Sequence, residues 1–126
     1  MDIKSALLSA PLQSATVNLN GIDVKVEEMT VERRVKFIET LAENIKAVED
    51  HKHEPDKFPH VDRLDEVIVC AIYSVVDHDG NLVFNMDDLP AMKKMPYETL
   101  RQIYHTVVSL QTGDTYAEAV NDEKKD

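Results

Sequence analysis

The sequence predicts a small, mainly α-helical domain of about four helices with an N-terminal β-hairpin, which is α+β by strict count. Apolar residues recur at three- and four-residue spacing in several stretches, which is typical of amphipathic helices. An Asn20-Gly21 pair separates two alternating stretches and favours a two-residue hairpin turn. At 126 residues, the chain is long enough for one modest core. We expect a single domain over residues 1–113, with the hairpin at 15–27 and a polar C-terminal tail at 114–126.

The register of this hairpin can be checked against its own pattern. With the turn at Asn20-Gly21, the apolar pairs all fall on one face, and they are Ala15–Val26, Val17–Val24 and Leu19–Ile22. A lone hairpin is marginally stable in water, so it must pack on helices or pair with another chain. Because the edges of a hairpin carry unpaired backbone groups, the sequence also predicts a homo-oligomer formed through the hairpin.

Helices are expected on both sides of the hairpin. A short helix runs from Asp2 to Ala10 and is ended by Pro11. A long helix begins after Thr30, a suitable N-cap, and runs to about Glu49. Apolar residues form one stripe along it, namely Val31, Val35, Ile38, Leu41, Ala42, Ile45 and Val48.

The run from Val61 to Val76 favours a strand by composition and a helix by periodicity. Valine and isoleucine are common in strands, but the apolar residues fill each turn of one helical face and the run is longer than a typical strand. We expect a helix capped by Asp62. The competing interpretation is a hairpin that pairs Ile72–Val76 with Leu82–Phe84. The single cysteine, Cys70, lies in this run and should behave as a small buried hydrophobe.

Two further helices should complete the domain. The pair Asp87-Asp88 supplies a cap for a short helix with Pro90 in its first turn, which ends near Lys94. The last helix begins at Pro96 and is stopped by Gly113. Its apolar stripe consists of Tyr97, Leu100, Ile103, Tyr104, Val107 and Leu110.

The net charge of −10 argues against binding to nucleic acid or to an anionic membrane, because both require basic patches. The sequence contains no apolar run of the roughly 18 residues that a membrane span needs. Its N-terminus is a poor signal peptide. We therefore expect a cytosolic protein that binds neither nucleic acid nor membrane.

Two stretches resemble metal sites, and we expect neither to bind a metal. His51, His53 and His60 share a proline-containing loop, but their spacing matches no common zinc pattern. The turn at Asp77–Gly80 resembles a calcium loop, yet both EF-hand registers fail at the glycine or at the terminal acid. A plain turn, with Asp77 bonded to its own backbone, explains the pattern. We also expect no cofactor.

The remaining candidates belong to the surface, because no serine, cysteine or histidine lies in a recognised catalytic motif. We therefore expect no enzymatic activity. Methionines suit adaptable binding surfaces, although they also fill cores. The candidate partner-binding residues are Phe84, Met86, Met92, Met95 and Tyr97.

Four motifs follow one another between Thr16 and Leu110 in a characteristic order. They are a hairpin (VNLNGIDVKV), a helix opening TVERRVKFI, an apolar run entering a D-x-D-G turn (IYSVVDHDGNLVF), and a final helix (LRQIYHTVVSL). In this order and spacing, the chain resembles the tail assembly chaperones of long-tailed bacteriophages. The resemblance implies a mainly helical fold and a non-catalytic role.

Members of that family bind the long, helical tape measure protein, help tail tube subunits assemble around it, and are absent from the finished virion. The resemblance implies the tape measure protein and the major tail tube protein as partners, and the host cytoplasm as the location. Many members are made in two lengths by a translational frameshift, and residues 114–126 would then be a linker. The alternative function is a small acidic inhibitor or mimic that neutralises a basic enzyme or DNA-binding partner.

Overall fold

The computed structural model describes the backbone of residues 2–125 and the side chains of residues 2–111. Within this part of the chain, five α-helices and one 3₁₀ helix accompany a three-stranded antiparallel sheet of order β1-β2-β3. In chain order the elements are α1 (Ile3–Leu8), β1 (Ser14–Leu19), β2 (Ile22–Glu27), α2 (Val31–His53), α3 (Glu66–Ile72), β3 (Val75–Val76), η1 (Met86–Asp88), α4 (Leu89–Met92) and α5 (Tyr97–Lys125). The predicted fold class, mainly helical with an N-terminal hairpin, is confirmed.

The hairpin of β1 and β2 has the predicted register, with Leu19 opposite Ile22 and Val17 opposite Val24. Its turn residues Asn20 and Gly21 have φ angles of 55° and 85°, which the tight two-residue turn requires. Side chains along β1 alternate between exposed and more buried positions. The hairpin packs against α5, and this contact supplies the partner that a lone hairpin needs.

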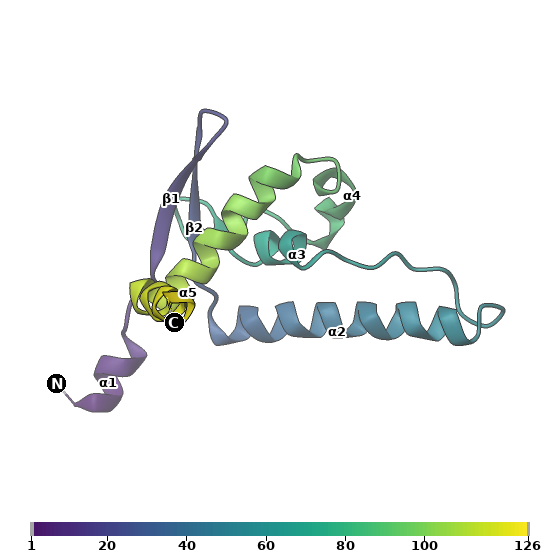
Figure 1. Ribbon diagram of the computed structural model, residues 1–126, viewed down its shortest axis with the longest axis horizontal. Coiled ribbons are helices and arrows are strands. Elements are labelled where there is room, and N and C mark those ends of the chain that lie inside the picture. The colour runs from purple at the N-terminus through teal and green to yellow at the C-terminus, as the bar shows by residue number, and fades with distance from the viewer. Residues whose placement is uncertain (1, 126) are drawn as a thin grey trace.

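The core lies between α3, α5 and the inner face of the sheet. Its hydrophobic members are Leu19, Val26, Val67, Ile68, Val69, Cys70, Ala71, Ile72, Val75, Val76, Met92, Leu100, Ile103 and Val107. Figure 1 shows α5 crossing beside the hairpin, with α3 near the centre and α2 running along one edge of the molecule. The predicted burial of Cys70 is confirmed.

The run Val61–Val76 contains part of each structure that the sequence allowed. α3 begins after Asp65, whose side chain caps it, so the expected helix is too long at both ends and its expected cap at Asp62 is wrong. β3 pairs with β2, and Val76 also bridges to Leu82, so part of the competing hairpin forms. β-branched valines at the end of the run gain more from a sheet than from another helical turn.

Three helix boundaries also differ from expectation. α2 extends one turn beyond Glu49, to His53. α4 begins after Asp88 with Pro90 in its first turn, as predicted, but the Asp88 side chain makes no capping bond to it. Asp88 instead forms a capping box with Asn85 around the 3₁₀ helix η1, which was not expected. α5 passes through Gly113 and continues to Lys125, so the predicted stop at this glycine is wrong. A glycine in a helix interior costs about 1 kcal/mol relative to alanine and does not by itself end a helix.

One ion pair joins the hairpin, α2 and the turn that follows β3. The buried Glu27 at the end of β2 lies 2.8 Å from the Arg33 guanidinium, which also donates to the Gly80 carbonyl at 3.0 Å. Thr30 caps α2 by accepting a hydrogen bond from the Arg33 amide at 3.1 Å. These contacts fix the start of α2 beside the sheet.

The turn at Asp77–Gly80 has the predicted plain geometry. The Asp77 carboxylate accepts hydrogen bonds from the amides of Asn81 and Asp79, at 3.0 and 2.9 Å. These bonds, led by the one to Asn81, hold the pKa of Asp77 below its ordinary value. Gly80 has a φ of 83°, in the left-handed region that glycine adopts without a steric cost.

Candidate partner-binding grooves

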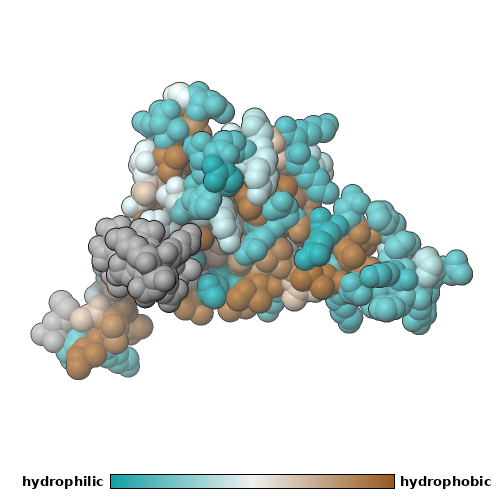
Figure 2. Space-filling model, viewed as in Figure 1, coloured by the Kyte–Doolittle hydropathy of each residue, from teal (hydrophilic) through white to brown (hydrophobic). Residues whose placement is uncertain are grey.

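α2 exposes an apolar surface along its length. None of its 23 residues, all of which the structure describes, is buried. Phe37 packs against the core from the side of α2 that faces the body, and Asn44 holds the chain before α3 by accepting from the Leu64 amide at 2.8 Å. The predicted stripe lies beside this contact side, and five of its members stay exposed, namely Val31, Val35, Ile38, Ala42 and Ile45. Figure 2 shows hydrophobic residues gathered along this edge of the molecule.

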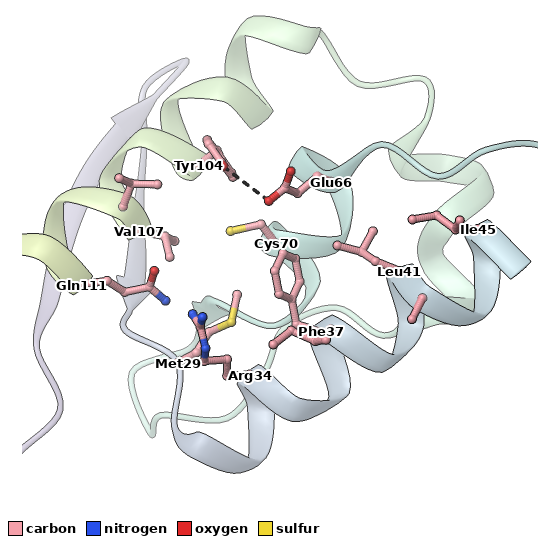
Figure 3. Close-up of a pocket in the computed structure, with 13 residues that line it drawn as sticks. Met29, Arg34, Phe37, Leu41, Ile45, Glu66, Cys70, Tyr104, Val107 and Gln111 are labelled. Carbon is pink, nitrogen blue, oxygen red and sulfur yellow. Dashed lines mark hydrogen bonds between the residues drawn. The ribbon is translucent and has the colours of Figure 1, made fainter.

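A hollow lies between this stripe, α3 and α5, and we call it the α2 groove. Its volume is about 460 Å³, which suits a ligand site in size. Figure 3 shows Phe37 and Leu41 rising from α2 toward Cys70, with Tyr104 and Val107 on α5 forming the facing wall. The lining residues are Met29, Arg34, Phe37, Ile38, Leu41, Ala42, Ile45, Glu66, Cys70, Tyr104, Val107, Val108 and Gln111.

The polar groups of the α2 groove lie mainly at its rim. The Tyr104 hydroxyl donates to a Glu66 carboxylate oxygen at 3.5 Å, and burial together with that carboxylate raises the pKa of Tyr104. Burial raises the pKa of the Cys70 thiol to about 11, so the thiol stays neutral and contributes an apolar floor. The groove therefore combines an apolar floor with one carboxylate, Glu66, and one guanidinium, Arg34.

A second hollow, the hairpin groove, lies between the hairpin, the segment after β3 and the start of α5, with a volume of about 840 Å³. Its lining residues are Thr16, Leu19, Asn20, Ile22, Asp23, Val24, Lys25, Val75, Val76, Asp77, His78, Val83, Phe84, Met95, Thr99 and Ile103. Two of the five candidate binding residues, Phe84 and Met95, are among them. Met86 lies half-buried against the core, Met92 is only 2% exposed and fills the core, and Tyr97 is 58% exposed. The structure therefore does not bring the five together on one surface.

Sequence reasoning located the α2 stripe but missed the other walls of the α2 groove. Phe37, Cys70 and Tyr104 are far apart in the chain, and the pattern alone did not link them. One signal was available, because α2 carries Phe37 in addition to its stripe. Its apolar surface is therefore wider than one packing contact needs.

The three histidines do not share the expected loop, because His51 and His53 lie in the last turn of α2. The rings of His51 and His60 meet edge to face, with their centroids 5.3 Å apart. His51 Nδ1 lies 2.8 Å from the Phe58 carbonyl oxygen, and His60 Nε2 lies 2.9 Å from an Asp62 carboxylate oxygen. Among the residues described by the structure, no three histidine, cysteine or acidic side chains come together as metal ligands. In the same part of the chain, none of the helices combines the length and the hydropathy needed to span a membrane.

Comparison with known proteins finds a similarity of fold. No protein family profile matches the sequence, and no curated protein matches it. A solved structure, that of the bacteriophage HK97 tail assembly chaperone, matches with a TM-score of 0.52 and 15% sequence identity. The match covers 85% of this chain and 91% of the solved chain. At this identity the comparison concerns the fold alone, and it shows that the protein shares the overall fold of a phage tail assembly chaperone.

Proposed function

We propose that this protein is a non-catalytic tail assembly chaperone of a long-tailed bacteriophage. It binds the tape measure protein, aids assembly of the tail tube in the host cytoplasm, and does not remain in the virion. The observation that carries the proposal is the apolar stripe of α2, which stays open beside the α2 groove. The fold shared with the HK97 chaperone supports it.

The α2 groove suits an amphipathic helix as its ligand. Such a helix would lie between α2 and α5 and place apolar anchors at three- and four-residue spacing against Ile38, Ile45 and Val107. Burying each anchor contributes about 1.5–3 kcal/mol before the cost of association. Two or three anchors therefore give weak, reversible binding, which a chaperone that must release its client requires. The net charge of −10 keeps a protein with this exposed surface soluble.

Binding to segments of the tape measure protein from the same genome tests the proposal. Ile38→Lys raises the net charge by one and places an ammonium in the stripe. We expect it to weaken binding at least tenfold, about 1.4 kcal/mol, in calorimetry or fluorescence anisotropy. The matched control is Glu43→Gln, which also raises the net charge by one but lies on the opposite side of α2, and it should bind like the wild type. Equal binding by Ile38→Lys and the wild type would contradict the proposal.

The same two variants distinguish the acidic mimic, which is the alternative function. A mimic binds through its charge, so Ile38→Lys and Glu43→Gln would weaken binding to a basic partner equally, and added salt would weaken it strongly. Binding through an apolar groove depends little on salt.

The neighbouring genes provide an independent check, including for the tail tube protein as second partner. A major tail gene upstream and a very long helical reading frame downstream would support the chaperone. Co-purification of the tube protein with this chain and the tape measure protein would test the tube contact directly.

A further inference from the structure

The N-terminal helix α1 exposes all of its apolar side chains. Its six residues are all exposed, with Ile3 at 80%, Leu7 at 71% and Leu8 at 78%. Figure 1 shows α1 projecting beyond the rest of the molecule, and Figure 2 shows its hydrophobic residues on the open surface. An isolated helix of this length is not stable in water, although the Asp2 side chain caps it by accepting from the Ser5 amide at 2.7 Å. The helix therefore needs a packing partner.

The connection to the body directs α1 away from its own domain. Gln13 is held at both backbone groups, because its amide donates to the Glu28 carboxylate and its carbonyl accepts from the Glu28 amide, each at 2.8 Å. Pro11 restricts the preceding Ala10 to extended backbone. We call residues 2–12 the N-terminal arm. Held in this way, the arm leaves its apolar face exposed and makes no buried contact with its own domain.

The α2 groove has the chemistry to receive this arm. The six residues of α1 span about 9 Å, and Ile3 and Leu7, four residues apart, share one face. The arm carries Asp2 and Lys4, and the groove carries Arg34 and Glu66, so each charge of the arm has a counterpart of opposite sign in the groove. We propose that the N-terminal arm of one copy docks in the α2 groove of a second copy, with Ile3 and Leu7 against the stripe of α2. The arm then shields the groove until another apolar helix displaces it.

We call this docking between two copies the arm exchange. Sedimentation over a range of concentrations measures the mass in solution and tests it. The wild type should approach twice 14.3 kDa as its concentration rises. The arm variant Ile3→Ser/Leu7→Ser and the groove variant Ile38→Lys should each associate at least tenfold more weakly. Mixing the two variants should restore a one-to-one complex, because one copy supplies the intact groove and the other supplies the intact arm. Circular dichroism checks that each variant is folded.

The hairpin edge is the competing surface for self-association, and a third variant separates it. The two-residue turn makes Leu19 and Ile22 a hydrogen-bonded pair, so the amide of Thr16 points away from β2. Thr16→Pro therefore removes only an outward-facing donor and blocks pairing at the edge. We expect it to associate like the wild type. A wild type that stays monomeric, an arm variant that associates normally, or loss of association in Thr16→Pro alone would each overturn the proposal.

The arm exchange rests on the α2 groove and not on the identity of a phage client. Its failure and that of the proposed function are therefore distinguishable. If the arm variant loses the mass shift while the wild type does not bind the tape measure protein, the arm exchange is supported. The tape measure protein is then rejected as the client. If both hold, the arm variant should bind the client more tightly than the wild type, because its groove is no longer shielded.

Discussion

Arg33 connects three segments that are distant in sequence, and its contacts are largely withdrawn from water. Its guanidinium reaches Glu27 at the end of β2 and the Gly80 carbonyl in the turn after β3. Removing one partner of such a pair leaves a charge and a carbonyl without their hydrogen bonds, which costs more than the intact pair contributes.

We predict that Arg33→Ala lowers the free energy of unfolding by about 2–4 kcal/mol. Urea denaturation measures this. The control is Lys36→Ala, one turn further along α2, where an exposed ion pair with Glu32 spans 3.6 Å; its effect should stay below about 0.5 kcal/mol. In the double variant with Glu27→Gln, the loss should be smaller than the sum of the single losses. Additive losses would show that the pair is not coupled.

The Asp77 carboxylate makes stability depend on acid pH. Its pKa is lowered in the folded protein, so its contribution is present above its unfolded pKa of about 3.9 and is lost as the pH falls through the folded pKa. We predict that Asp77→Asn has a lower thermal midpoint than the wild type at pH 7, and that the difference narrows below about pH 4. A difference in thermal midpoint that stays the same from pH 7 to about pH 3 would contradict the prediction.

Among the secondary structure elements, those with local signals were predictable. The turn pair and the alternating pattern determine the register of β1 and β2, and all three apolar pairs agree with it. The C-terminal end of α3 could not be predicted, because Val75 and Val76 pair with β2, a strand about fifty residues earlier in the chain. Local periodicity carries no information on that partner. The end of α5 was misjudged because glycine weakens a helix without stopping it.

The helix α5 also provides a test of the predicted polar tail. Among the side chains of α5 that the structure describes, which end at Gln111, the buried ones are Leu100, Ile103 and Val107. We predict that truncation after Gln111 changes the thermal midpoint by no more than about 2 °C, or about 0.5 kcal/mol. A cut after Thr106, which removes Val107, should unfold the domain. If the chain cut after Gln111 also unfolds, residues 112–126 pack on the core and the linker interpretation is wrong.

On the scale of the whole molecule, the sequence identified an apolar stripe on α2 but not its role. Whether Ile38 and Ile45 face the core or solvent depends on how α2 packs on α3, which is a property of the assembled chain. The methionine cluster shows the same limit, because Met92 fills the core while Met95 lines the hairpin groove. Because both residues are methionines, the sequence alone could not tell the buried one from the one that lines a groove.

The thiol at the floor of the α2 groove reports on the integrity of the fold. Cys70 is 2% exposed, and its raised pKa of about 11 leaves little thiolate at pH 8. We predict that a thiol reagent labels it about two orders of magnitude more slowly in the native protein than in urea. Fast labelling in buffer would mean that α2 and α5 separate often.

The one-sided attachment of α2 also determines how a bound helix leaves. Since none of its residues is buried, α2 can detach at a free-energy cost well below that of global unfolding. Arg33 holds its first turn to the sheet, and Asn44 holds its middle to the segment before α3. We therefore expect the turns beyond Asn44 to move outward first. The residence time of a ligand would then follow the opening rate of this helix, and hydrogen exchange should slow along α2 when the groove is filled.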